Sequence, residues 1–348
     1  MKIIVLAGGL STERDVSLTS GTMICNALRR LGHKAVLVDL FFGLELPDDI
    51  EKLFDVSGEL APRPVSEEAP DIEAVKASRP DSGYGEIGKN VLEACKAADI
   101  VFMALHGEIG ENGKLQAIFD VMGIRYTGAG YLGSAMAMQK GIAKQIFTCK
   151  GVPTPKGKMY SHATQGDIKK DFTLPVIVKP CSGGSSIGIT KAQTADELDA
   201  AIEEAFKYED EVLVESFITG REFTCGVLDG KALPVAEVVP NEGFYDYKHK
   251  YQAGMIQEII PAPISDEKTK QIQNESVRAF NALGLEVYSR MDFIMDAQGD
   301  IYCLEANTLP GMTPTSHFPQ ECKNIGMSYE QLCERIVELS LQARDEGR

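Results

Sequence analysis

The sequence lacks the features that would place it in a membrane or outside the cell. No run approaches the roughly 18 apolar residues that a transmembrane helix needs. Residues 2–7 form a strand-like segment directly after Met1, without the basic region, apolar core and cleavage site of a signal peptide. The eight cysteines are scattered and none forms a Cys-x-x-Cys pair, which favours reduced thiols. We therefore expect a cytoplasmic protein.

An excess of positive charge is also missing. The chain has 35 Lys and Arg against 51 Asp and Glu, a net charge of -16. Phosphate backbones and anionic membrane surfaces repel such a chain, so we expect neither nucleic acid nor a membrane as partner. An anionic substrate would need a local cationic pocket. The length of 348 residues exceeds one ordinary core and predicts two or three domains.

Residues 290–319 contain the segment around which the rest of the chain is organised. Two apolar runs lie on either side of a short polar segment with a glycine, which predicts a β-hairpin. A loop at residues 297–300 gives the simplest register, in which Met295 pairs with Tyr302. The register matters because alternate residues of a strand point to opposite faces.

This register gathers polar side chains at the end of the hairpin that leads into a Pro-Gly loop. Asp292 lies opposite Glu305, and Arg290 lies opposite Asn307. Two carboxylates directly opposite each other are destabilising unless something neutralises them. Oxygen donors without Cys or His suit Mg²⁺ held jointly with substrate phosphates. A solvated, charged hairpin face is the alternative, but the otherwise apolar strands favour a metal site.

The N-terminal residues have the pattern of a β-α-β unit from a doubly wound sheet. A strand at 2–7 runs into a Gly-Gly turn at 8–14, a helix follows, and the next strand covers 35–40. The full glycine fingerprint of a dinucleotide site is missing. A ligand near the carboxyl end of the strand remains an option, with Glu13 facing it. Alternatively, Glu13 merely complements the helix dipole.

Two more glycine-rich loops each follow a predicted strand. The first, 106–113, begins with His106, which alone is more often structural than catalytic. The second, 181–188, follows a strand that ends in Lys179, and its backbone N–H groups and hydroxyls could cradle a phosphate. No Gly-Lys-Ser/Thr closes this loop, so it is not a Walker loop. A flexible hairpin tip is the alternative.

The remaining segments suggest two lobes and a lid. A single helix is predicted over 132–150, and a strand at 211–215 runs into a link where an adenine ring could lie. Glu222 follows at a position suited to ribose hydroxyls. Residues 241–254 form a polar, aromatic loop too long for an idle connection, which makes them a lid candidate.

Together these stretches resemble the D-alanine–D-alanine ligase family, within the ATP-grasp fold. The motifs run in family order over nearly the full chain, and although none is decisive alone, their order is specific. The matching segments are 8–18, 106–116, 178–188, 220–223, 244–251 and 305–313.

The resemblance implies an α/β fold that is α+β in its C-terminal half, in a three-domain ATP-grasp architecture. An N-terminal parallel-sheet α/β domain would cover 1–127, a central lobe 128–211, and a C-terminal lobe with the hairpin and lid 212–348. The family joins two D-alanines to D-alanyl-D-alanine for peptidoglycan precursor synthesis. ATP phosphorylates the first carboxylate, and the second amine attacks the D-alanyl phosphate. A homodimer is also expected, with D-alanine and ATP as small-molecule partners.

The resemblance also assigns roles to individual residues. Arg290 and the backbone N–H of Gly311 would stabilise the oxyanion, where preorganised donors contribute most. Glu13 would hold the first ammonium group. Further assignments are two Mg²⁺ ions, or Mn²⁺ in their place, on Asp292, Glu305 and Asn307; a hydrogen-bonded set of Glu13, Ser185 and Tyr251; phosphate contacts from Lys140, Lys179, Lys250 and the loop with Ser185 and Ser186; adenine and ribose contacts from Glu215, Ser216, Ile218 and Glu222; and substrate contacts from His106, Ser316 and His317.

Some positions depart from the family pattern and leave alternatives open. Asn112 and Gln139 replace aspartates, at places where we expect little effect on the chemistry. His317 stands where an apolar residue is frequent, which keeps a D-alanine–D-serine ligase as an alternative. A nucleotide-binding regulator without catalysis is disfavoured by the intact site, because a pure binder needs no Arg290. A hydride-transfer enzyme is disfavoured by the missing glycine fingerprint.

Overall fold

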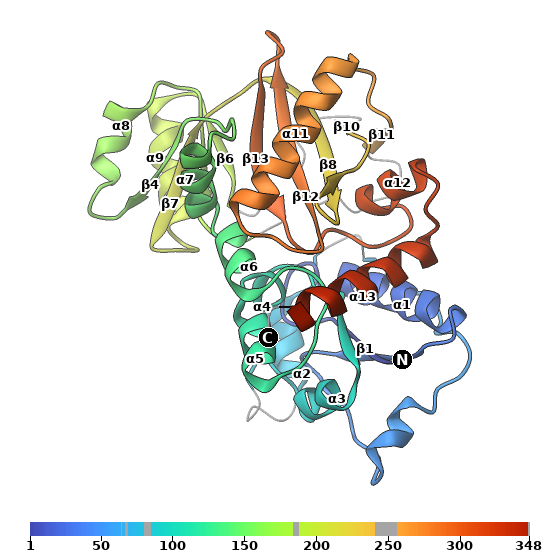
Figure 1. The fold of residues 1–348 in the computed structure, drawn as a ribbon. Coiled ribbons are helices and arrows are strands. Elements are labelled where there is room, and N and C mark those ends of the chain that lie inside the picture. Colours follow the sequence, from blue (N-terminus) through green and yellow to red (C-terminus); the bar gives the residue numbers. More distant parts are fainter. Residues whose placement is uncertain (64, 67–68, 80–84, 184–187, 241–255, 347–348) are drawn as a thin grey trace.

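The protein is described by a computed structural model of residues 1–348, except 64, 67–68, 80–84, 184–187, 241–255 and 347–348. The described residues form one parallel sheet and two antiparallel sheets, each covered by helices (Figure 1). This combination confirms the predicted α/β class with a mixed second half. No helix in the described part of the chain has both the length and the apolarity to cross a membrane.

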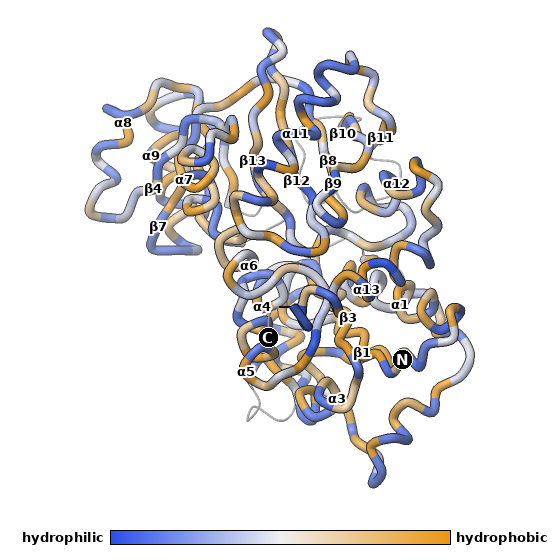
Figure 2. The backbone as a smooth tube through the Cα atoms, in the orientation of Figure 1, coloured by the Kyte–Doolittle hydropathy of each residue, from blue (hydrophilic) through white to orange (hydrophobic). Residues whose placement is uncertain are grey.

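The first unit is a three-stranded parallel sheet in the order β2-β1-β3. Its middle strand is buried from Ile3 to Ala7, as expected where helices cover a parallel sheet. Both β1 and β3 have hydrophobic colours in Figure 2. The predicted β-α-β opening is therefore confirmed. The elements of this unit are β1 (Lys2–Ala7), α1 (Arg14–Arg30), β2 (Lys34–Asp39), η1 (Ile50–Phe54), α2 (Ile72–Ser78), α3 (Val91–Ala97), β3 (Ile100–Met103), α4 (Glu108–Glu111) and α5 (Lys114–Met122).

The predicted single helix over 132–150 is wrong, because the chain forms two helices. These are α6 (Tyr131–Met138) and α7 (Lys140–Lys150), with a break at Gln139. The Gln139 side chain caps α7 by accepting from the Gly141 N–H at 3.2 Å. The Lys140 N–H instead donates to the Cys181 carbonyl at 2.7 Å. The break thus joins the start of α7 to the glycine-rich loop after the next sheet strand.

The central unit is a four-stranded antiparallel sheet in the order β4-β7-β5-β6. Valines of the two middle strands pack against Leu198 and Ile202 of a covering helix and form a separate core. The predicted strand that ends at Lys179 and the predicted strand at 211–215 are both confirmed, each with its end shifted by one residue. The elements are β4 (Gly157–Ser161), η3 (Gln165–Asp167), α8 (Ile168–Asp171), β5 (Val176–Pro180), β6 (Thr190–Ala192), α9 (Ala195–Ala205) and β7 (Glu211–Ser216).

The third unit is a six-stranded sheet in the order β11-β10-β8-β12-β13, with β9 paired to β8. Helix α11 packs against its strands. The chain then returns through two helices. The elements are β8 (Gly220–Leu228), β9 (Lys231–Ala232), β10 (Ala236–Pro240), β11 (Ile256–Ile259), α11 (Asp266–Ala282), β12 (Tyr288–Asp296), β13 (Ile301–Asn307), α12 (His317–Asn324) and α13 (Tyr329–Glu346).

The predicted hairpin is present, but its register changes along its length. Met295 pairs with Ile301, so the predicted Met295–Tyr302 pair is wrong. A bulge between Asp292 and Phe293 then shifts the pairing by one residue. Beyond the bulge the two predicted functional pairs, Asp292 with Glu305 and Arg290 with Asn307, are both confirmed. The bulge therefore corrects the register before the polar end of the hairpin.

The last helix packs on the first unit. In Figure 1, α13 runs back beside α1, and residues of both helices share one apolar core. Leu332 and Ile336 are completely buried there together with Ile24 and Leu28. Arg30 also pairs with Glu330 at 2.9 Å. The domain boundaries at 127/128 and 211/212 stay a prediction, but the core of the first unit includes residues from the C-terminal end of the chain.

Candidate functional site

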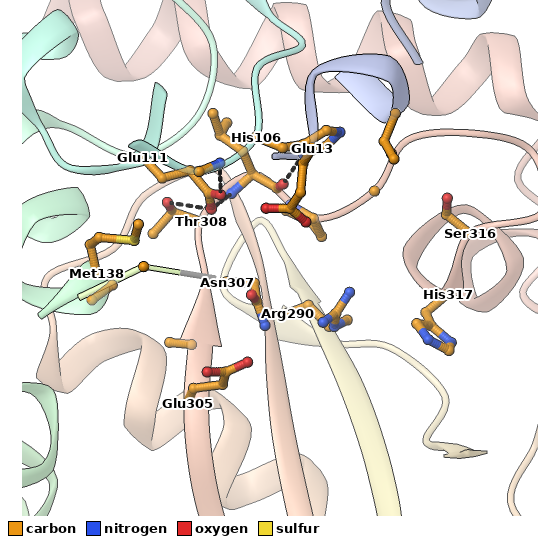
Figure 3. Close-up of a pocket in the computed structure, with 18 of the residues that line it drawn as sticks. Glu13, His106, Glu111, Met138, Arg290, Glu305, Asn307, Thr308, Ser316 and His317 are labelled. Carbon is orange, nitrogen blue, oxygen red and sulfur yellow. Dashed lines mark hydrogen bonds between the residues drawn. The ribbon is translucent and has the colours of Figure 1, made fainter. Parts of the chain in front are cut away.

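A cavity of about 330 Å³ lies where the three units meet. Its lining comes from loops and strand ends that are far apart in the sequence. Many of the predicted site residues meet here (Figure 3). They are Glu13 and His106 from the first unit, Lys140 and Lys179 from the central unit and its preceding helix, and Arg290, Glu305, Asn307, Gly311, Ser316 and His317 from the third.

The polar end of the hairpin forms a compact network of charges. The Arg290 Nε and Nη2 atoms donate to the two carboxylate oxygens of Asp292, each at 2.8 Å. Asn307 Nδ2 donates to Asp292 Oδ2 at 2.9 Å. Glu305 Oε2 lies 3.9 Å from the Lys140 ammonium. Each carboxylate thus has a cationic neighbour, as the unfavourable pairing of two carboxylates requires.

These side chains have the donor chemistry of a magnesium site. Asp292, Glu305 and Asn307 supply carboxylate and amide oxygens, which hard divalent cations prefer. Among the described residues no group of three or more His, Cys, Asp and Glu side chains is close enough to hold a metal. The candidate site therefore depends on the amide of Asn307 and on substrate oxygens. Figure 3 shows Arg290, Glu305 and Asn307 projecting from neighbouring strands into the same space.

A carboxyl group that the sequence analysis missed lies behind Arg290. Glu321 on α12 is completely buried and accepts the Gly226 N–H at 2.6 Å. Gly226 pairs with Arg290 across the sheet, and a Cβ atom at position 226 would lie 2.7 Å from Glu321 Oε2. Burial raises the pKa of Glu321 well above its usual value. Only the packing of α12 against β8 reveals this contact, because the two residues are far apart in sequence.

The first unit contributes a second missed carboxylate, Glu111. Its oxygens accept the Gly107 N–H at 2.7 Å and the Leu309 N–H at 3.1 Å. His106 Nδ1 lies 2.9 Å from the Leu309 carbonyl oxygen. Burial and the nearby charge of Glu13 raise the pKa of Glu111. Two residues of the first unit therefore hold both polar groups of Leu309, two positions before Gly311.

Three buried ionisable side chains form a cluster, of which Lys179 lines the cavity. Glu215 is 3% exposed and forms ion pairs with Lys144 at 2.6 Å and with Lys179 at 2.5 Å. Burial alone would raise the pKa of Glu215, but the two ammonium groups outweigh burial and lower it. Burial lowers the pKa of Lys144. The sequence analysis assigned Lys144 no role, although this residue lies one helical turn after Lys140.

The other predicted residues divide into Ser316 and His317, which line the cavity, three that are not among its lining residues, and those outside the described chain. Ser216 ends β7, Ile218 follows it, and Glu222 lies in β8; all three are partly buried. Ser316 Oγ lies 2.8 Å from the Thr313 hydroxyl, and His317 Nδ1 lies 2.9 Å from a carboxylate oxygen of Glu258, another residue that the sequence analysis missed. Outside the described residues are Ser185, Ser186, Lys250 and Tyr251, with the whole lid candidate at 241–254.

Comparison with known proteins gives consistent matches over almost the full chain. The models for the D-ala D-ala ligase N-terminus and C-terminus match residues 2–129 and 139–338. A D-alanine–D-alanine ligase of Pediococcus pentosaceus is 46% identical over 341 residues, 97% of each chain. A second, of Lacticaseibacillus casei, is 41% identical over 349 residues, covering 100% of this chain and 98% of the relative.

Solved structures of the same family are also similar to this chain. The D-alanine–D-alanine ligase of Bacillus anthracis complexed with ATP has a TM-score of 0.76 at 28% identity, covering 100% of this chain and 99% of the other. The VanG D-Ala:D-Ser ligase of Enterococcus faecalis has a TM-score of 0.75 at 33% identity, covering 97% and 99%. The similarity thus extends to one ligase with a different second substrate.

Proposed function

The chain belongs to the D-alanine–D-alanine ligase family, and we propose that its cavity is where ATP and two D-alanine molecules meet. The product is D-alanyl-D-alanine, a precursor for peptidoglycan synthesis. One observation carries this proposal: three kinds of side chain, each kind from a different part of the chain, line a single cavity. They are the carboxylates Glu13 and Glu111 of the first unit, the cations Lys140 and Lys179 from α7 and the central unit, and the oxygen donors Glu305 and Asn307 of the third unit. Because the reaction consumes ATP, we place it in the cytoplasm.

The phosphates of ATP would lie beside Lys140 and Lys179. Both lysines line the cavity of a chain whose net charge is -16, so they supply the local positive charge that an anionic substrate needs. The adenosine part would extend past Lys179 towards the β7–β8 link. Its neighbours there would be Glu215, Ser216, Ile218 and Glu222, with Ser186 and Lys250 completing the phosphate contacts.

Asp292, Glu305 and Asn307 would hold two Mg²⁺ ions, or Mn²⁺ in their place. The support is the donor chemistry, since carboxylate and amide oxygens match these cations. Bound there, the ions would neutralise phosphate charge and make phosphorus more electrophilic. Arg290 occupies both oxygens of Asp292 in the structure, so cation binding and the guanidinium would compete for this carboxylate.

In the first step, a carboxylate oxygen of the first D-alanine would attack the γ-phosphorus of ATP, giving D-alanyl phosphate and ADP. Glu13 would hold the substrate ammonium group, with His106 beside the acyl group and Ser185 and Tyr251 bonded to Glu13. In the second step, the amine of the second D-alanine would attack the carbonyl carbon. Arg290 and the Gly311 N–H would stabilise the oxyanion until phosphate leaves and the amine loses its proton.

A D-alanine–D-serine ligase is the second candidate, and the Glu258–His317 pair is the observation that favours it. This polar pair lies beside Ser316, at the proposed subsite of the second amino acid. An imidazole there can form a hydrogen bond to a serine hydroxyl. His317→Leu should therefore lower the relative kcat/KM for D-serine over D-alanine by about tenfold. An unchanged ratio would remove His317 from acceptor selection.

A homodimer remains part of the proposal. Its support is a set of exposed apolar side chains on α5 and α6: Val121, Tyr131 and Leu132 are 89%, 50% and 56% exposed. Large exposed apolar side chains grouped on neighbouring helices are typical of protein interfaces. Sedimentation equilibrium of the wild type and of Leu132→Glu tests this, and a monomeric wild type would contradict it.

The deciding experiment measures ADP release with Mg-ATP. The protein is given D-alanine alone, D-alanine with D-serine, or L-alanine, and the products are identified by mass. We expect ADP release coupled to D-alanyl-D-alanine. A dominant mixed dipeptide would move the assignment to the D-serine ligase, and ADP release independent of amino acid would contradict ligation.

A further inference from the structure

The buried Lys144–Glu215–Lys179 cluster contains more positive charge than negative charge. Its members come from α7, β7 and β5, and they are 4%, 3% and 7% exposed. Two ammonium groups and one carboxylate leave one positive charge. A buried charge without a counter-ion is unfavourable, so the cluster is suited to a site that an anion occupies.

The two lysines have different surroundings. Lys144 Nζ has three oxygen neighbours: Glu215 at 2.6 Å, the Thr154 hydroxyl at 2.7 Å and the Pro155 carbonyl at 2.8 Å. Two of these contacts are hydrogen bonds and the third is an ion pair, so protein oxygens surround the Lys144 ammonium group. Among the described residues, Glu215 at 2.5 Å is the only ion-pair partner of Lys179, which lines the cavity. Lys144 thus contacts only protein oxygens, whereas Lys179 lines the cavity where a ligand can bind.

The backbone makes room for this arrangement. A Cβ atom on Gly157 would lie 2.4 Å from Lys144 Cδ and 2.8 Å from Cε, so a larger residue at 157 would displace the lysine. Gly157 pairs with Glu215 across the β4–β7 ladder. Strands β4 and β7 therefore provide both the space for the Lys144 side chain, at Gly157, and its carboxylate partner, Glu215.

Resting on the proposed function, we propose that Lys144 is a positioning residue that balances Glu215 and thereby leaves the charge of Lys179 available to the ATP phosphates. Without Lys144, Glu215 and Lys179 form a neutral pair, and the phosphates lose the attraction of one unit charge. Lys144 itself does not touch the nucleotide. Its loss should weaken the binding of phosphate groups and leave the binding of the nucleoside unchanged.

The test compares ADP with adenosine, a ligand without phosphates, by calorimetry on the full chain with Mg²⁺. Lys144→Met should weaken ADP binding by about tenfold, a size expected for one charge near a phosphate at an intermediate dielectric constant. Adenosine binding should change by less than about twofold. Lys150→Met removes the same charge from an exposed position of α7 and serves as the matched control.

A double variant separates charge balance from simple structural support. Lys144→Met with Glu215→Gln removes one cation and one anion, so the net charge beside the cavity returns to that of the wild type. Lys144→Met lowers the ratio of ADP affinity to adenosine affinity. The double variant should restore at least half of that decrease, measured as the logarithm of the ratio. Should Lys144→Met fail to fold, Lys144→Gln, which is neutral but keeps a polar side chain, replaces it in both variants.

The outcomes distinguish this inference from the proposed function. A wild-type protein that binds no ADP would overturn the proposed function itself. A single variant that weakens ADP and adenosine equally, or neither, would overturn the role of Lys144 while leaving the ligase assignment intact. Failure of the double variant to recover the ratio would do the same.

Discussion

At the scale of residues, Arg290 lies at the centre of the polar end of the hairpin. Its guanidinium donates to both oxygens of Asp292, an arrangement with strong geometric preference. Asn307 binds the same carboxylate, and the buried Glu321 lies behind the strand. A substitution of Arg290 would therefore disturb the proposed metal donors together with the proposed oxyanion contact, and would affect both steps of the proposed reaction. Glu305 is a cleaner target.

Glu305→Gln should lower kcat for ADP release by at least about a hundredfold, because the neutral amide is a poorer ligand for a divalent cation. The melting temperature should stay within a few degrees, since the side chain is partly exposed in the cavity. Asp300→Asn, in the exposed turn of the same hairpin, is the matched control. Unchanged ATP turnover in Glu305→Gln would remove this carboxylate from the mechanism.

At the scale of elements, the link from β13 to α12 depends on the first unit for its position. Glu111 and His106 hold Leu309 by its N–H and its carbonyl, although about 200 residues separate them in sequence. This contact fixes the backbone shortly before Gly311. Oxyanion stabilisation needs such donors to be held in place before the reaction begins.

Glu111→Gln should lower kcat by about tenfold or more and leave the KM for ATP within about twofold. A glutamine retains one acceptor oxygen, but its NH₂ group would face an N–H of Gly107 or Leu309. Steady-state kinetics with each substrate varied separately would show the difference. A rise in the KM for ATP by the same factor as the fall in kcat would indicate a general loss of structure instead.

Helix α12 makes stability depend on pH through Glu321. Its pKa is raised in the folded protein, so the unfolded chain releases this proton first as the pH rises. The stabilising contribution is complete below the ordinary value of 4.5 and is lost as the pH rises towards the folded value. Glutamine has no proton to release and can still accept the Gly226 N–H.

The melting temperature of Glu321→Gln minus that of the wild type should therefore increase between pH 4 and pH 7, by about 3 °C or more. Scanning calorimetry of both proteins across this range measures the gap. Glu338→Gln on the exposed side of α13 controls for the loss of an acidic side chain. A gap that does not change with pH would show that Glu321 is ionised in the folded protein.

At the scale of the whole molecule, α13 joins the end of the chain to its beginning. Ile336 is completely buried against the first unit, so Ile336→Ala should lower the free energy of unfolding by about 2–5 kcal/mol. Urea unfolding followed by circular dichroism would measure this change, with exposed Gln342→Ala as control. A loss below about 1 kcal/mol would mean that α13 contributes little to the core.

Sequence reasoning succeeded where periodicity or a chain of motifs determines the structure. The β-α-β opening, the hairpin and the pairs Asp292–Glu305 and Arg290–Asn307 belong to this class. It failed where tertiary contacts override a local pattern. The break at Gln139 depends on a hydrogen bond to Cys181, and the bulge beside Asp292 depends on how β12 and β13 pair.

Residues whose partners are distant in sequence were missed for a related reason. Lys144 reads as an ordinary helix lysine until β7 brings Glu215 beside it. Glu321 reads as a surface residue of an amphipathic helix until α12 packs on Gly226. Neither neighbour can be identified from local spacing, because burial and charge pairing arise only when separate units come together.

The packing of α13 on α1 also has a consequence for synthesis on the ribosome. Helix α1 emerges early, but the helix that covers it is translated about 300 residues later, the separation between Arg30 and Glu330. During most of translation the part of α1 that packs on α13 has no native cover, although β1 and β2 already cover another part, and it is a natural binding site for chaperones. A chain that ends before α13 keeps the α13-facing part of α1 exposed, which makes it a target for cellular proteases.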